Sequence, residues 1–228
     1  MSSLYEAFGM LMNMDRELFQ ILGVTLRMSL FSTTVSCLIG MPLGVLTGKS
    51  DFKGKGTIKK LTGTLMGLPP VVAGLIVYML FSKNGPLGAM GLLFTVEVMV
   101  IAQCLLITPV VISITESMTS INAKSISETA KGLNFSKGKT ALLLLSENKQ
   151  ALLSVVLTAF GRSIAEVGAV SLVGGNIQWK TRVMTTAIML ETNKGNFSFA
   201  LALGIILLII SLIVNVLASV LVKEDKNA

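Results

Sequence analysis

Apolar residues gather in long runs along the chain, and short polar segments separate the runs. The runs cover about residues 19–47, 61–81, 92–115, 150–171 and 198–222. A helix needs roughly 20 apolar residues to cross the hydrocarbon core of a bilayer. Each run therefore predicts one membrane-spanning helix. The pattern predicts an all-α, polytopic membrane helix bundle with about five transmembrane helices, and residues 3–17 are compatible with an interfacial helix or part of an extra span.

Composition and charge support a membrane protein. Hydrophobic residues make up 52% of the chain and charged residues only 14%, whereas soluble domains carry about a quarter charged residues. The net charge is +7, but the basic residues lie between the apolar runs rather than on one face, which argues against binding of nucleic acid. The first residues lack the basic region and cleavage site of a signal peptide, so we expect the first span to be retained.

The distribution of lysine and arginine predicts the orientation of the spans. The polar segments after the first and third runs and the C-terminal tail hold 5 + 5 + 2 = 12 basic residues, and the segments of the opposite side hold five. Cytoplasmic loops carry the excess of positive charge. We therefore expect the N-terminus outside and the C-terminus in the cytoplasm.

The sequence shows none of the residue patterns that the common enzyme sites use. The chain has no histidine, and Cys37 and Cys104 each fall inside an apolar run, where we interpret them as reduced packing residues. No metal site is predicted. Two phosphate-loop-like stretches, Gly44–Ser50 and Gly132–Thr140, have the wrong spacing and follow no strand. We expect no nucleotide binding by this chain, and a membrane-anchored enzyme is excluded because no extramembrane domain is large enough to enclose a site.

Small residues recur at four-residue spacing in several runs. Such spacing lets helix backbones approach closely in a bilayer. It predicts close helix packing, and sliding of helices along these seams is compatible with it. The positions are Gly40, Gly44 and Gly48 in the first run, Gly63 and Gly67 in the second, and Gly161, Ala165 and Ala169 in the fourth.

Prolines interrupt the second run in the stretch GLPPVVAGL. Pro69 and Pro70 each remove a backbone donor, so the helix is expected to kink or open there. Irregular backbone at membrane depth requires cover from protein or a water-filled cavity. The kink is therefore either a structural feature alone or a feature beside a substrate path.

Ionisable residues inside the runs mark a second candidate. Arg162 and Glu166 stand at i and i+4 in the fourth run, which predicts a pair on one helix face. Such residues usually face the interior of a bundle, and this pair is either a self-neutralised structural pair or the border of a path or gate. Arg27 and Glu97 have similar depth and form a possible second pair.

The segment Gly174–Glu191 combines a flexible turn with an amphipathic pattern. Val183, Ala187 and Leu190 are predicted to share one face of a helix, and Trp179 suits the membrane–water interface. The segment is either an interfacial helix that caps the bundle or a dock for an extracellular partner.

One cytoplasmic stretch carries a family resemblance. The sequence ETAKGLN followed by SKGKTALLLLSE resembles the "EAA" loop of binding-protein-dependent ABC transporter permeases. Glu128 and Ala130 match the motif, Thr129 replaces its second alanine, and the downstream glycine falls at Asn134, which can adopt a left-handed turn. The motif's frequent Leu-Pro ending is replaced by a Ser-Glu pair, residues 146–147.

The resemblance extends over most of residues 18–222. The stretches LPPVVAGL (Leu68–Leu75) and GRSIAEVGAVSLVGGNI (Gly161–Ile177) are similar to oxyanion permeases for molybdate, sulfate and tungstate. The longer combination with TRVMTTAIMLETNKG is closest to tungstate permeases. The resemblance implies a MetI-like permease fold in one domain, 1–228, with a core at 18–222 and a cytoplasmic coupling loop at 116–149.

The resemblance also implies a function and a set of partners. The chain would be a transport subunit without enzyme activity, in the cell membrane of a prokaryote, importing an oxyanion by alternating access. A second copy of the chain, two cytoplasmic ABC ATPases, an extracytoplasmic oxyanion-binding protein and membrane lipid would be its partners, and ATP and magnesium would bind the ATPase. A stand-alone channel or secondary transporter is the competing class.

The implied roles fall on three groups of residues. The ATPase-coupling loop would use Glu128, Thr129, Ala130, Lys131, Gly132, Leu133, Asn134 and Phe135. The translocation path or gate would use Pro69, Pro70, Arg162, Glu166 and Gly168. The contact with an external partner would use Asn176, Gln178 and Trp179.

Overall fold

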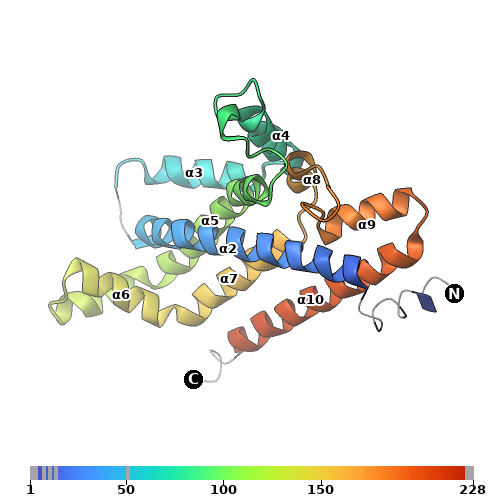
Figure 1. Ribbon diagram of the computed structural model, residues 1–228. Helices are drawn as coiled ribbons and strands as arrows, with labels where there is room; N and C mark the ends of the chain where they lie inside the picture. Colours follow the sequence, from blue (N-terminus) through green and yellow to red (C-terminus); the bar gives the residue numbers. More distant parts are fainter. Residues whose placement is uncertain (1–4, 7–8, 10–11, 13–14, 50–51, 224–228) are drawn as a thin grey trace.

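The computed structural model shows an elongated bundle of helices (Figure 1) and describes residues 5, 6, 9, 12, 15–49 and 52–223. Over these ranges the chain forms helices and no strand. The helices are α2 (Arg16–Lys49), α3 (Lys55–Met66), α4 (Pro70–Phe81), the short η1 (Gly88–Met90), α5 (Val96–Gly132), α6 (Lys137–Glu147), α7 (Lys149–Ile164), α8 (Gly168–Gly174), α9 (Met184–Asn193) and α10 (Phe197–Lys223).

Three of the predicted spans are continuous helices. Arg16–Lys49, Val96–Ile121 and Phe197–Val220 are each long and apolar enough to cross a membrane. The predicted span over 61–81 is instead broken into α3 and α4, which bend by 99°. The predicted span over 150–171 is divided between α7 and α8. Over the described residues, length and composition give three uninterrupted spans, or up to five if two bent pairs, α3 with α4 and α6 with α7, are each one span.

The helices α2 and α5 lie side by side in close contact (Figure 1). A Cβ atom added to Gly40, Gly44 or Gly48 would lie 2.7, 2.6 and 2.7 Å from side-chain atoms of Val111, Thr115 and Thr119, respectively. The predicted close packing at these three glycines is confirmed. Gly63, by contrast, has no atom within 4 Å of an added Cβ, so it contributes to no such seam within the chain.

The contacts between α2 and α5 also show how the pair α3 and α4 crosses the membrane. Each glycine of α2 faces the residue 71 positions later (111 − 40, 115 − 44 and 119 − 48), so α2 and α5 run in the same direction. Two helices that run in the same direction require one crossing between them. The pair α3 and α4 is therefore a broken span rather than a re-entrant loop.

The break between α3 and α4 is caused by the predicted prolines. Gly67 ends α3, Pro69 is extended (φ −60°, ψ 130°), and Pro70 is the first residue of α4. Proline fits the first turn of a helix because its missing donor has no partner there. The predicted kink is confirmed, and it turns α4 away from the direction of α2 and α5 (Figure 1).

Apolar packing joins the helices at three levels. One cluster includes Met28, Ala73, Met99 and Val170 and joins α2, α4, α5 and α8. A second includes Leu18, Ile164, Met184 and Leu203 and joins α2, α7, α9 and α10. The third includes Cys37, Ile107 and Val155. The predicted packing role of Cys37 is confirmed.

Large apolar side chains also cover the outside of the bundle. Leu208 and Leu212 on α10 are 72% and 64% exposed, and Leu38 on α2 is 71% exposed. Apolar side chains gain nothing by leaving lipid, so these faces suit direct contact with acyl chains.

Candidate translocation path and coupling segment

The two broken spans meet at their breaks. A Cβ atom added to Gly168, the first residue of α8, would lie 3.0 Å from Val71 and 3.3 Å from Pro70 at the start of α4. A Cβ on Gly74 would lie 2.7 Å from the Cα of Ala169. Pro70 and Gly168, which the sequence assigns to the path, are therefore neighbours, and α4 and α8 pack as one unit (Figure 1).

The predicted pair between Arg162 and Glu166 is wrong. The helix α7 ends at Ile164, so Glu166 lies beyond its end and not one turn along the same face. The Oε1 atom of Glu166 instead accepts a hydrogen bond of 3.1 Å from the backbone N–H of Ala169 in the first turn of α8. Neither residue contributes to an ion pair in the part of the chain that the structure describes.

The break between α7 and α8 is also fixed from outside these helices. The hydroxyl of Thr185 on α9 donates to the backbone oxygen of Glu166 at 2.8 Å. Arg162 is exposed on the surface of the single chain, while the next residues, Ser163 and Ile164, are buried. The last turn of α7 thus presents a cation outward from an otherwise apolar span.

A buried polar cluster that the sequence analysis missed lies beside this break. Gln103 on α5 is fully buried. Its Oε1 atom accepts hydrogen bonds from the hydroxyls of Ser32 on α2 (2.6 Å) and Ser163 on α7 (2.9 Å). Its Nε2 atom donates to the backbone oxygen of Ser163 at 2.8 Å. Gln103 is the single glutamine in the apolar run 92–115, and this polar residue in an apolar run could have indicated the buried cluster.

Arg27 and Glu97 do not form the ion pair that their depth suggested. Both line one pocket of about 250 Å³ together with Phe31. Their charged groups form no ion pair within 4.0 Å in the described structure. The two residues therefore lie at the same pocket without an ion pair.

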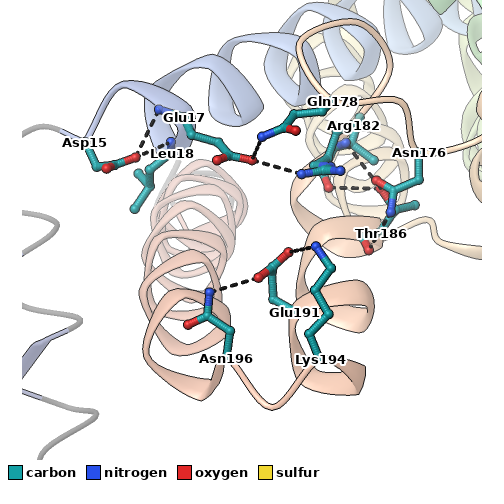
Figure 2. Close-up of polar contacts among 11 residues, drawn as sticks. Asp15, Glu17, Leu18, Asn176, Gln178, Arg182, Thr186, Glu191, Lys194 and Asn196 are labelled. Atoms are coloured by element: carbon teal, nitrogen blue, oxygen red, sulfur yellow. Dashed lines mark hydrogen bonds and ion pairs between the residues drawn. The ribbon is translucent and has the colours of Figure 1, made fainter.

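A cluster of polar side chains joins the start of α2 to the segment before α9 (Figure 2). The Oε1 atom of Glu17 accepts hydrogen bonds from Gln178 at 2.8 Å and from Arg182 at 2.9 Å. Arg182 is only 8% exposed. Nearby, Glu191 accepts from Lys194 and from Asn196, each at 2.9 Å.

The charge state of Glu191 follows from these contacts. Burial raises the pKa of this carboxyl, but the hydrogen bonds from Lys194 and Asn196 and the charges of Lys194 and Arg182 lower it further than burial raises it. The net result is a pKa below the ordinary value of 4.5. The side chains of this cluster enclose a cavity of about 180 Å³ lined by Glu17, Gln178, Arg182, Glu191, Lys194, Asn196 and Phe199.

Two of the three residues assigned to an external partner are engaged within the chain. Asn176 accepts from the Thr186 hydroxyl at 3.0 Å, and Gln178 donates to Glu17 (Figure 2). Trp179 has a left-handed backbone (φ 64°) and is 54% exposed. Of the three, Trp179 presents its large side chain to the outside.

The predicted interfacial helix is also revised. The helix α9 starts at Met184 and packs against α10 and α2. Its buried residues include Thr185, Thr186 and Glu191 as well as the apolar Met184 and Ala187. The face that holds Ala187 is buried, as predicted, and Met189, Thr192 and Asn193 are exposed; the polar side chains that are buried find partners inside the protein.

The predicted coupling loop, 116–149, begins on α5, includes α6 and ends at the first residue of α7. The motif residues Glu128, Thr129, Ala130, Lys131 and Gly132 form the last turns of α5. Ala130 is buried, whereas Glu128, Thr129 and Gly132 are exposed.

The turn between α5 and α6 has the geometry that the motif suggested. Asn134 adopts a left-handed conformation (φ 55°), as predicted. The N–H of Phe135 bonds to the oxygen of Ala130 at 2.8 Å, and Ser136 caps α6. Leu133 is 58% exposed and Phe135 is 39% exposed, so two apolar side chains project from this turn.

Comparisons with known proteins agree with this arrangement. Residues 40–224 match the family described as binding-protein-dependent transport system inner membrane component. The tungstate uptake system permease protein TupB of Peptoclostridium acidaminophilum is 37% identical over 96% of each chain. The TupB protein of Campylobacter jejuni is 39% identical over 92% of this chain and 88% of its own. A probable anion ABC transporter permease protein of Haloferax volcanii is 38% identical over 89% of each chain.

The family match spans the α2–α5 seam, both broken spans and the coupling turn, and the three relatives cover almost the whole bundle. All three names describe permease proteins, and the name of the Haloferax volcanii protein adds that it is part of an ABC transporter. Permeases are transport subunits rather than enzymes. The chain belongs to the family of inner-membrane components of binding-protein-dependent transport systems.

Proposed function

We propose that the chain is the membrane-spanning subunit of an ABC importer for tungstate. The observation that carries this proposal is the identity of 37% and 39% to two tungstate uptake permeases over most of the chain. The family implies an external binding protein that delivers the substrate and an ATPase that drives transport. ATP and magnesium bind the ATPase, and this chain performs no covalent chemistry.

The path runs where the two broken spans meet and includes Pro69, Pro70, Arg162, Glu166 and Gly168. Breaks in helices at membrane depth are tolerated where they line a cavity or are covered by protein. The exposure of Arg162 supports this role, because a cation in lipid is costly and a cation beside a path attracts a dianion. The cap between Glu166 and Ala169 leaves the positive charge of Arg162 without a partner on its own helix.

A second copy of the chain completes the path. Val71, Leu75 and Met79 on α4 are 57%, 49% and 63% exposed in the single chain. The helix α4 packs on α8, and Arg162 lies in the last turn of α7 just before α8, so a partner copy that covered both the apolar face and Arg162 would enclose the cation. We propose a homodimer with the path between its two copies.

The turn after α5 is the contact with the ATPase. Leu133 and Phe135 project from it and suit an apolar groove on the ATPase surface. The excess of lysine on this side supports a cytoplasmic location for the turn and the C-terminus, with the N-terminus and the Glu17–Arg182 cluster outside. Trp179 is then available to the binding protein. Transport proceeds by alternating access, in which each ligand acts through different contacts in the two states.

Deletion of the gene tests the substrate. Cell-associated tungsten, molybdenum and oxyanion-derived sulfur are measured at low external concentrations, with a complemented strain as the control. Loss of tungsten alone is the expected result. Loss of molybdenum or sulfur with unchanged tungsten would discard tungstate as the substrate. Uptake that persists when the ATPase is inactivated would indicate a channel or secondary transporter instead.

A further inference from the structure

The end of α7 leaves backbone oxygens that need partners inside the membrane. The last four carbonyl groups of any α-helix have no partner within the helix. In water such groups are hydrated, but in a bilayer an unsatisfied carbonyl costs several kcal/mol. The helix α7 ends at Ile164, in the middle of the apolar run that the sequence presents as one span. The break must therefore be stabilised by donors from elsewhere.

Gln103 supplies such a donor from α5. Its Nε2 atom lies 2.8 Å from the backbone oxygen of Ser163, which is in the last turn of α7. The N–H of Glu166 reaches the same oxygen at a longer distance of 3.3 Å. The other half of the Gln103 amide accepts from the hydroxyls of Ser32 and Ser163. A side chain that lacks either half of the amide cannot form all three bonds.

The bonded residue stands next to the cation of the proposed path. Ser163 follows Arg162 directly, and Gly168 begins the next helix. Fixing the Ser163 carbonyl fixes the end of α7 and hence the direction in which Arg162 points. It also fixes the point from which the chain turns into α8, which packs on Pro70 and Val71.

The same glutamine sits on the helix that carries the coupling motif. The helix α5 is continuous from Val96 to Gly132, with Pro109 inside it. From Gln103 to Glu128 is 128 − 103 = 25 residues, or about 38 Å at 1.5 Å per residue. A displacement of the coupling turn therefore reaches Gln103 along one helix, without passing through α6 or α7.

We propose that Gln103 is a positioning residue that holds the break between α7 and α8 and transmits movement of α5 to the path. This inference rests on the proposed transport function. It goes beyond that function by assigning the mechanical link to one buried amide on α5. Arg162 and Gly168 are the residues that Gln103 positions.

The test compares Gln103→Met with two matched controls. Methionine keeps the length and volume of the side chain but removes the amide, whereas Ser32→Ala and Ser163→Ala each remove one hydroxyl and keep the bond to the Ser163 carbonyl. Each variant is assembled with the ATPase and reconstituted in proteoliposomes with the binding protein. The measured quantity is ATP hydrolysed per tungstate imported. We expect this ratio to rise for Gln103→Met and to stay at the wild-type value for the two controls.

A structural readout separates this inference from the transport function. Spin labels at the exposed positions Thr158 on α7 and Leu172 on α8 report the distance between the two helices. Labelled chains are diluted in unlabelled ones, so that only distances within one chain are measured. Gln103→Met should broaden the distance distribution, and the serine controls should not. Failure of the wild-type complex to import any oxyanion would remove the proposed function, while the label distances would still test the role of Gln103.

Two results would overturn the proposal. One is Gln103→Met with wild-type coupling and wild-type label distances. The other is the same loss of coupling in Gln103→Met, Ser32→Ala and Ser163→Ala. The serine variants keep the bond from Gln103 to the Ser163 carbonyl, so that bond would then not explain the loss. If Gln103→Met fails to assemble, Gln103→Asn takes its place, since its amide is one methylene too short to reach both helices, and the same two defects are expected of it.

Discussion

Replacing Gly44 by alanine tests the seam between α2 and α5. An added Cβ at this position would lie 2.6 Å from the Cβ of Thr115 and 2.8 Å from the backbone oxygen of Ile112. Carbon atoms in good contact are about 3.5–4.0 Å apart, so the helices would have to separate by roughly 1 Å. Truncation of Thr115 to alanine cannot relieve the clash, because its Cβ remains and the other contact is a backbone atom.

The expected magnitude comes from two opposing effects. Overpacking of a well-packed interior costs about 1–3 kcal/mol, and the exchange of glycine for alanine inside a helix returns about 0.5–1 kcal/mol. Gly63 provides the matched control, because it also lies inside a helix but has no atom within 4 Å of an added Cβ. Gly63→Ala therefore keeps only the favourable effect. Because the favourable effect is common to both variants, they should differ in unfolding free energy by the overpacking cost alone, about 1–3 kcal/mol.

The assay is unfolding of the purified protein in mixed micelles, followed by circular dichroism as the fraction of denaturing detergent rises. Gly44→Ala should unfold at a lower fraction than the wild type, and Gly63→Ala at the same or a higher fraction. The double variant Gly44→Ala with Thr115→Ala should remain destabilised. Equal stability of Gly44→Ala and Gly63→Ala would refute the inferred contact between the backbones of α2 and α5.

Three further changes have defined outcomes. The pKa of Glu191 is lowered below 4.5 in the folded protein, so its contribution to stability is present above that pH and is lost as the pH falls through the lowered value. Glu191→Gln should therefore make the unfolding free energy less dependent on pH in the acid range. An unchanged pH dependence would contradict the hydrogen bonds to this carboxylate. Glu17→Gln removes the charge that faces the buried Arg182. It should lower the free energy of unfolding by about 1–3 kcal/mol, since Glu17 is partly exposed, and this loss should appear as a lower thermal midpoint than that of the wild-type protein. Gly132→Pro or a charge-reversed Glu128 should uncouple ATP hydrolysis from transport while the bundle stays inserted in the membrane. Wild-type transport in both variants would contradict the assignment of the coupling turn.

The sequence predicts features of the fold whose cause is local. The runs that become α2, α5 and α10 are long and apolar, so bilayer thickness alone predicts their helices. The consecutive Pro69 and Pro70 remove two neighbouring backbone donors, and proline fits best in the first turn of a helix, so a break is expected there. The left-handed turn at Asn134 follows from the intrinsic tolerance of asparagine for that conformation.

Features that depend on tertiary contacts were not predictable in this way. The stretch between Ser163 and Gly168 has no proline, and its Arg-x-x-x-Glu spacing favours a continuous helix. The break there is held by donors from other helices, namely Gln103 and the hydroxyl of Thr185. A sequence pattern on one helix cannot report partners that come from elsewhere.

The burial of α9 was missed for a related reason. Polar residues are mostly exposed, so the sequence gives no sign that Thr186 and Glu191 would be buried. In the structure Thr186 bonds to Asn176 and Glu191 bonds to Asn196, so the polar face is satisfied inside the protein. Of the candidate site, the sequence placed Pro70 and Gly168 in one group, and these residues lie close together in the structure, but it did not predict the polar cluster beside the break.

The most direct test of the whole account is reconstituted transport. Proteoliposomes containing this chain and its ATPase are loaded with ATP, supplied with the binding protein outside, and assayed for uptake of tungstate with molybdate and sulfate as competitors. The account predicts uptake that requires the ATPase, ATP and the binding protein together and that falls when Arg162 is replaced by glutamine. Uptake that proceeds without ATP, or no uptake of tungstate when all components are present, would contradict it.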